Sequence, residues 1–149
     1  MTNPFDLKTA LLARHAQHVV LIHFPIALFL MGAVFDVLSL RYKKAGLAEA
    51  AYYNLMGAAI SALPAVATGL LAWRFQLEGQ TLKGILLLHL VFACVSTLLI
   101  WLAFQLQRRD RRRTEARPAL RLSVEFLAVV AVTLTGHLGG FLSGVNVPG

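Results

Sequence analysis

Four long apolar runs dominate the chain and limit the folds that are open to it. They cover about residues 18–40, 50–73, 84–106 and 122–142, with short polar stretches between them. Each run is on the order of 20 residues long, the length that a helix needs to cross the ~30 Å hydrocarbon core of a bilayer. The runs lack the polar face of a soluble helix and the two-residue alternation of a membrane β-strand. We therefore predict an all-α fold, a single four-helix transmembrane bundle over residues 1–149.

The composition agrees with this prediction. The chain is 58% hydrophobic and only 14% charged, whereas a soluble domain is roughly 45–50% apolar and about 25% charged. Its single cysteine, Cys94, lies inside the third run. One cysteine excludes an internal disulfide and the C-x-x-C-H attachment of a c-type haem.

The distribution of positive charge predicts the orientation of the bundle. Ten of the 14 lysines and arginines fall on one side of the predicted membrane: Arg41, Lys43, Lys44, Arg108, Arg109, Arg111, Arg112, Arg113, Arg117 and Arg121. Only Lys8, Arg14, Arg74 and Lys83 fall on the other. The positive-inside rule places the ten in the cytoplasm and both termini on the outer, periplasmic side of a bacterial inner membrane. We interpret the basic cluster as an anchor to anionic lipid headgroups, and not as a nucleic-acid site.

Small residues recur every four positions in the second run. Gly57, Ser61, Ala65 and Gly69 would lie along one face of a helix and allow another helix to approach closely. The neighbour could belong to this chain or to another subunit, and we favour packing within the chain.

The histidines are the main chemical signal, because ionisable residues within a membrane are costly and often functional. His23 and His89 each lie about five residues after the predicted outer start of a run, and His137 lies about five residues before an outer end. A helix rises ~1.5 Å per residue, so three helices would each place a histidine ~7 Å below the outer boundary. His15 and His18 would lie just above this layer, with His18 as a reserve candidate.

Several cofactors could use such a layer. Haem b takes one or two imidazoles from facing helices in an apolar slot, and Arg74 could hold its propionates. Copper or zinc could bind the three imidazoles of His23, His89 and His137. A quinone could hydrogen-bond to one histidine, which would also accept a proton. We favour haem b, because the layer is apolar and offers neither a cysteine thiolate nor clustered carboxylates.

Two carboxylates are predicted near the opposite, inner boundary. Asp36 lies late in the first run and Glu125 lies early in the fourth. They could form a proton path, or they could pair with Arg41 or Arg121; we favour pairing. The sequence contains no H-E-x-x-H motif and no Gly-rich phosphate loop, so it gives no support to hydrolase or nucleotide-driven chemistry.

One motif carries a resemblance to a known family. The stretch His18-Val-Val-Leu-Ile-His23-Phe-Pro25-Ile-Ala-Leu28, followed by Asp36, resembles the first helix of an uncharacterised bacterial family of four-helix membrane proteins, although Val19 stands where that family usually has proline. His89, the segment 136–140 and the pair Gly144-Val145 are similar to its later features. Members of that family also occur joined to Rieske iron–sulfur or c-type cytochrome domains, so the resemblance implies a redox setting on the outer face.

These observations predict a haem-b-binding electron-transfer subunit with its site near the periplasmic face, and His18, His23, His89 and His137 as candidate ligands. Its partners would be lipid, a quinone, and a membrane complex or periplasmic redox protein. Two alternatives stay open. One is an accessory subunit of a larger respiratory or photosynthetic complex, and the other is a metal-binding membrane protein. Nothing in the sequence resembles a substrate pocket, so we expect a carrier or accessory subunit without intrinsic catalysis.

Overall fold

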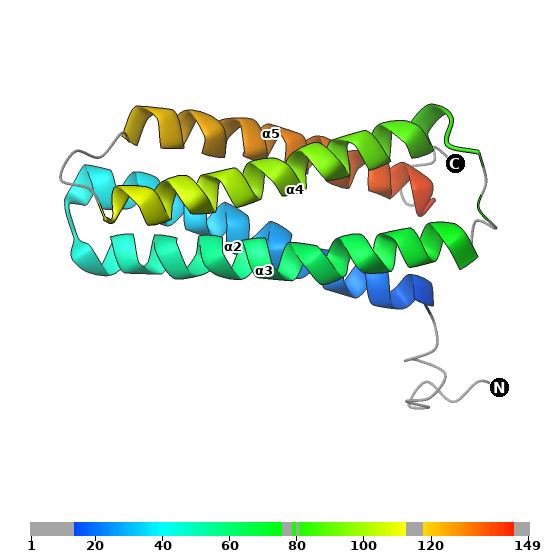
Figure 1. Ribbon diagram of the computed structural model, residues 1–149, viewed down its shortest axis with the longest axis horizontal. Coiled ribbons are helices and arrows are strands. Elements are labelled where there is room, and N and C mark those ends of the chain that lie inside the picture. Colours follow the sequence, from blue (N-terminus) through cyan, green and yellow to red (C-terminus); the bar gives the residue numbers. More distant parts are fainter. Residues whose placement is uncertain (1–13, 76–78, 80, 113–117, 145–149) are drawn as a thin grey trace.

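The computed structural model contains four long helices arranged as two hairpins (Figure 1). It describes all residues except 1–13, 76–78, 80, 113–117 and 145–149. For residues 14–16 it describes the backbone but not the side chains. The helices are α2 (Arg14–Tyr42), α3 (Ala45–Phe75), α4 (Gly84–Asp110) and α5 (Pro118–Leu142). The all-α prediction is confirmed, and the described residues contain no strand.

Each helix extends past the apolar run that predicted it. The runs predict only the part of a helix that lies in hydrocarbon, and polar residues can continue the same helix toward the headgroups. Helix α3 begins at Ala45, directly after the α2–α3 turn, in which Lys43 has a φ of 51°. Helix α4 runs on to Asp110, and Arg111 caps its carboxyl end.

All four helices are long and apolar enough to cross a membrane. Their outward faces carry large apolar side chains, such as Leu98 with 70% of its surface exposed and Phe126 with 68%. In water such a surface would be unstable, whereas lipid tails solvate it. The exposed apolar surface is therefore the lipid-facing surface of the bundle.

Helices α2 and α3 form the closest contact of the bundle, through small residues. A Cβ atom built on Gly57 would lie 3.1 Å from Leu28 of α2, and one built on Gly32 would lie 3.0 Å from the Leu55 side chain. Six alanines of α3 are also buried. The row of small residues in the second run thus packs within the chain, as predicted, and against α2.

The two hairpins bury equivalent positions, although the sequence shows no repeat that we can detect. The buried residues of α2 are Pro25, Phe29, Gly32 and Asp36, and those of α4 include Ser96, Ile100, Ala103 and Gln107. The two sets follow the same intervals of four, three and four residues, which keep them on one face of each helix. Helices α2 and α4 therefore use matching faces toward the core.

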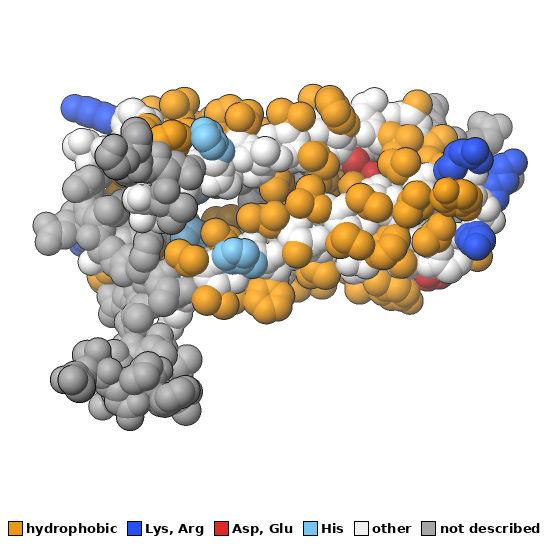
Figure 2. All heavy atoms as spheres, turned by 180° about the vertical axis from the view of Figure 1, so that it is seen from behind, with side chains coloured by type: hydrophobic (Ala, Val, Ile, Leu, Met, Phe, Trp, Pro, Cys, Tyr) orange, Lys and Arg blue, Asp and Glu red, His pale blue; other side chains and the backbone are white. Residues whose placement is uncertain are grey.

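The bundle has two chemically different ends. The end where α2 begins and α5 finishes carries the histidines, and we call it the histidine end. The opposite end, with the α2–α3 and α4–α5 connections, carries Arg41, Lys43, Lys44, Arg108, Arg109, Arg111 and Arg112, and we call it the arginine end. Figure 2 shows histidine side chains near one end and most of the lysine and arginine side chains at the other.

Candidate functional site

His89 of α4 is held between its own helix and α5. Its Nδ1 lies 3.1 Å from the backbone oxygen of Thr135. A carbonyl oxygen can only accept a hydrogen bond, so Nδ1 carries the proton and donates it. The imidazole lies on Gly139, where a Cβ would come within 3.3 Å of Cε1. The hydrogen bond to Thr135 leaves the lone pair of the neutral ring on Nε2, the usual ligating atom.

His18 of α2 has a similar contact with α3. Its Nδ1 lies 3.3 Å from Oγ1 of Thr68. That hydroxyl already donates to the backbone oxygens of Pro64, at 2.8 Å, and Ala65, at 3.0 Å. It therefore accepts from His18, and the lone pair of this imidazole is also on Nε2. A Cβ on Gly69 would lie 2.9 Å from Cε1 of His18, so only glycine fits there without movement.

His18 and His89 occupy equivalent places in the two hairpins. His18 precedes the buried Pro25 by seven residues, and His89 precedes the buried Ser96 by seven. Seven residues are close to two helical turns, so each histidine continues the core-facing row of its helix. Both are half-buried, and both lie against a glycine of the second helix of their hairpin.

The other predicted ligands lie differently. His23 is exposed, and its Nδ1 donates to the oxygen of Val19 in the same helix at 2.6 Å. His137 is exposed, and its ring packs edge-to-face on Phe141 with centroids 5.0 Å apart. Arg74 is exposed at the same end. The His15 side chain lies outside the described residues. Across the described part of the chain, no three His, Cys, Asp or Glu side chains form a group that could hold a metal ion.

The helices pack loosely at the histidine end. The described segments 17–24 of α2, 84–95 of α4 and 133–142 of α5 contain no buried residue. The hydrophobic core lies farther along the bundle, around Phe29, Leu55 and Ile100. Figure 2 shows a hollow between α2 and α5 near this end, with histidine side chains beside it. The side chains of these three helix segments are therefore accessible from outside the bundle.

A buried ion cluster lies toward the arginine end. Arg121 of α5 donates from Nε to Oδ2 of Asp36 at 2.7 Å and from a second nitrogen to Oδ1 at 3.1 Å. Its third nitrogen donates to Asp110 of α4 at 2.7 Å. Gln107 also donates to Asp36, at 3.3 Å. The favoured pairing of Asp36 with Arg121 is thus confirmed, whereas Arg41 is exposed and lies over the Tyr42 ring.

Glu125 is the exception within this cluster. Its side chain is 3% exposed, and its Oε1 lies 3.9 Å from Nε of Arg121, too far for a hydrogen bond. Neither of its carboxylate oxygens accepts a hydrogen bond from a described residue. The predicted pairing with Arg121 therefore holds for both carboxylates, through hydrogen bonds for Asp36 and through a longer ion pair for Glu125.

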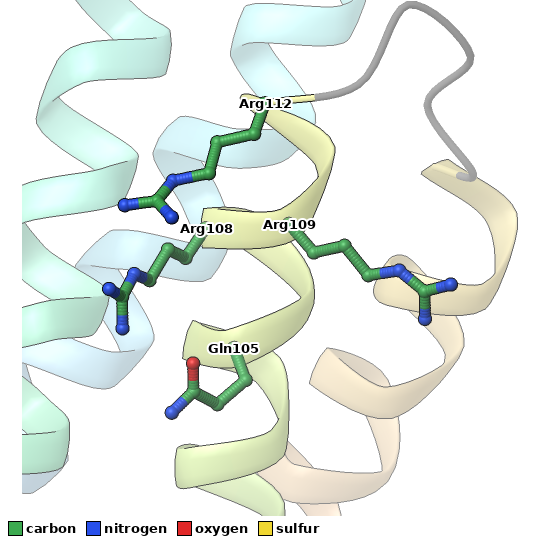
Figure 3. Close-up of a pocket in the computed structure, with 4 residues that line it drawn as sticks. All are labelled: Gln105, Arg108, Arg109 and Arg112. Atoms are coloured by element: carbon green, nitrogen blue, oxygen red, sulfur yellow. The ribbon is translucent and has the colours of Figure 1, made fainter.

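The last turns of α4 form a shallow basic hollow on the surface. It is lined by Gln105, Arg108, Arg109 and Arg112. Figure 3 shows Arg108 and Arg112 extending to one side of the helix and Arg109 to the other. Open arginines at a helix end suit anionic lipid headgroups, as the sequence led us to expect.

Residues 14–146 match the family model described as predicted membrane protein (DUF2231). The chain belongs to the DUF2231 family. No curated protein and no solved structure matches it. The matched range covers all four helices, so membership in DUF2231 agrees with the membrane-spanning fold and with the resemblance seen in the first run.

Sequence reasoning missed several residues that this DUF2231 protein brings together. Gln107 and Asp110 lie beyond the predicted end of the third run, so they looked like loop residues. Their spacing of three places them on one face of α4 once the helix continues. Thr68 and Thr135 gave no signal, because a hydroxyl that bonds to its own helix resembles an apolar residue in sequence.

Proposed function

We propose that this protein is a haem-b-binding electron-transfer subunit of the membrane, with the haem between the two hairpins at the histidine end. One observation carries the proposal: His18 and His89 are half-buried and continue the core-facing rows of α2 and α4 at equivalent positions. Two imidazoles from equivalent helices could both ligate the iron of a haem. We assign these two histidines as the ligands.

The hydrogen bonds of both histidines support this assignment. In each ring Nδ1 donates, to the oxygen of Thr135 for His89 and to the hydroxyl of Thr68 for His18. A histidine that ligates a metal usually donates from its other ring nitrogen to a protein oxygen, which fixes both tautomer and orientation. Both rings therefore have the protonation pattern that a haem ligand needs.

The surroundings also suit a haem. The loosely packed histidine end offers apolar side chains and no buried residue over three of the four helix ends. Arg74 at the end of α3 is a cation available for a propionate. When bound, haem b takes up and releases one electron at its iron. His18 and His89 would hold the ring, and the apolar side chains around them would pack on it.

The orientation of the bundle decides on which side of the membrane the proposed haem would lie. By the positive-inside rule the arginine end faces the cytoplasm of a bacterial inner membrane, so the haem would lie near the periplasmic face. We propose that it exchanges electrons with a quinol in the membrane and with a periplasmic cytochrome or iron–sulfur protein.

The test is a titration of the purified protein with haem in detergent, followed at the Soret band. We expect one haem per chain in the wild type. His18→Ala and His89→Ala should each weaken binding at least tenfold or abolish it, because each removes one axial ligand. His23→Ala and His137→Ala are the matched controls, being exposed histidines at the same end.

Size-exclusion chromatography and far-UV circular dichroism would show that the variants are folded. Equal haem binding by wild type, His18→Ala and His89→Ala would contradict the proposal. Loss of haem binding only in His23→Ala and His137→Ala would instead place the site on the exposed surface of α2 and α5.

A second candidate is an accessory subunit of a larger membrane complex. The observation that favours it is the exposure of His23 and His137 on the outer face of apolar helices, where polar side chains can make contacts with a partner helix. Blue native electrophoresis of native membranes would test this role. His23→Leu with His137→Leu should release the chain from its complex, and an unchanged complex would exclude these residues as contacts.

A further inference from the structure

Among the described residues, the ion cluster near the arginine end holds three carboxylates and one guanidinium. Asp36, Asp110 and Glu125 face the single guanidinium of Arg121, from helices α2, α4 and α5. All four side chains are less than a tenth exposed. With every group ionised, these four side chains alone would carry two net negative charges in a medium of low dielectric, which is very unfavourable.

The hydrogen bonds of the cluster show where the imbalance lies. Arg121 directs its three nitrogens to Asp36 and Asp110. Three buried oxygens have no donor within the described part of the chain: Oε1 of Gln107 and both carboxylate oxygens of Glu125. Buried polar atoms nearly always have partners, so a group of acceptors without donors indicates a missing cation or proton.

Among the described residues, Arg121 is the only cation with an electrostatic contact to Glu125. Its electrostatic contacts are with Asp36, which repels it, and with Arg121, which attracts it. On α3 the nearby ionic contact is between Glu49 and Arg111, and it lies at the surface with the two side chains 49% and 36% exposed. Arg111 is thus engaged outside the buried cluster.

We propose that Glu125 is a proton-binding site in the membrane interior. The proton is the ligand, because Arg121 already occupies both Asp36 oxygens and stands 3.9 Å from Glu125. A metal cation would be repelled by that guanidinium and would find too few free oxygens to replace its water. This site is independent of the haem proposal and lies toward the other end of the bundle.

The binding step is a simple proton transfer. A hydronium ion gives its proton to the Glu125 carboxylate and becomes water, and one negative charge of the cluster is neutralised. The new O–H can donate to the Asp36 carboxylate, its nearest electrostatic neighbour of like charge. Asp110, in the last turn of α4, connects Arg121 to the arginine end and so gives the proton its entry side.

Infrared spectroscopy of the full-length protein in lipid bilayers tests the proposal. We expect the C=O band of a protonated carboxylic acid at neutral pH, shifted in heavy water. The chain has four glutamates and three aspartates, so labelling with ¹³C-glutamate should move the band and ¹³C-aspartate should leave it. Both labels work on the wild type and need no variant.

The variants then assign the residue. Glu125→Gln should remove the band, and Glu49→Gln, a surface glutamate paired with Arg111, should leave it unchanged. A neutral-pH spectrum without a protonated carboxyl, or a band that follows aspartate labelling, would overturn the proposal. Loss of the band on adding Na⁺ at constant pH would overturn it in favour of a metal cation.

Discussion

Replacing Arg121 with leucine should destabilise the bundle by about 3–5 kcal/mol, the usual cost of removing one partner from a buried ion pair. Arg121 makes three short hydrogen bonds that join α5 to α2 and α4. Its removal leaves the completely buried Asp36 carboxylate without its charged partner, while Gln107 still donates to it. Unfolding by a denaturing detergent, followed by circular dichroism, would measure the change in free energy.

Two further variants separate this effect from general disruption. Arg111→Leu removes a surface ion pair with Glu49 and should cost only about 0–1 kcal/mol. The double variant Asp36→Leu with Arg121→Leu should recover part of the loss, because it removes the uncompensated charge together with its partner. A single Arg121 variant as stable as the wild type would show that the cluster does not hold the helices together.

Replacing Gly32 with valine should be the other strongly destabilising change, by about 1–3 kcal/mol from overpacking. Even a single Cβ at this position would lie 3.0 Å from Cγ and Cδ2 of Leu55 and 3.2 Å from its backbone nitrogen. Valine adds two more methyl groups, and the backbone of α3 cannot move aside as a side chain can. Helices α2 and α3 would therefore have to separate. The same detergent-unfolding measurement applies.

Gly136 provides the matched control for this experiment. It lies within α5, and a Cβ there would meet nothing within 4 Å. Gly136→Ala should therefore stabilise the helix slightly, by about 0.5–1 kcal/mol. Opposite signs at the two glycines are the expected result. If Gly32→Val behaved like Gly136→Ala, the close α2–α3 contact would be wrong.

The sequence was sufficient to predict the four spans, because apolar length is a direct requirement of the bilayer. It was less informative about helix ends, since polar residues such as Gln107 and Asp110 continue α4 beyond its apolar run. The pairing of Asp36 with Arg121 could be anticipated from a shared depth, although 85 residues separate them. Gln107 and Asp110 could not be foreseen as partners while α4 seemed to end earlier.

Depth in the membrane alone does not show which histidines face a neighbouring helix. From sequence, His23, His89 and His137 appeared equivalent, with His18 in reserve. In the structure His18 and His89 point toward neighbouring helices, whereas His23 and His137 are exposed. Rotation of a helix about its axis depends on packing, here on Gly69 and Gly139, and one sequence does not specify it.

The most direct test of the haem proposal is a dithionite-reduced minus air-oxidised visible spectrum of protein purified from cells supplied with ample haem. The proposal predicts a sharp b-type α-band, with one haem per chain by pyridine haemochrome assay, and loss of the band in His89→Ala. A flat difference spectrum from folded wild-type protein would contradict it.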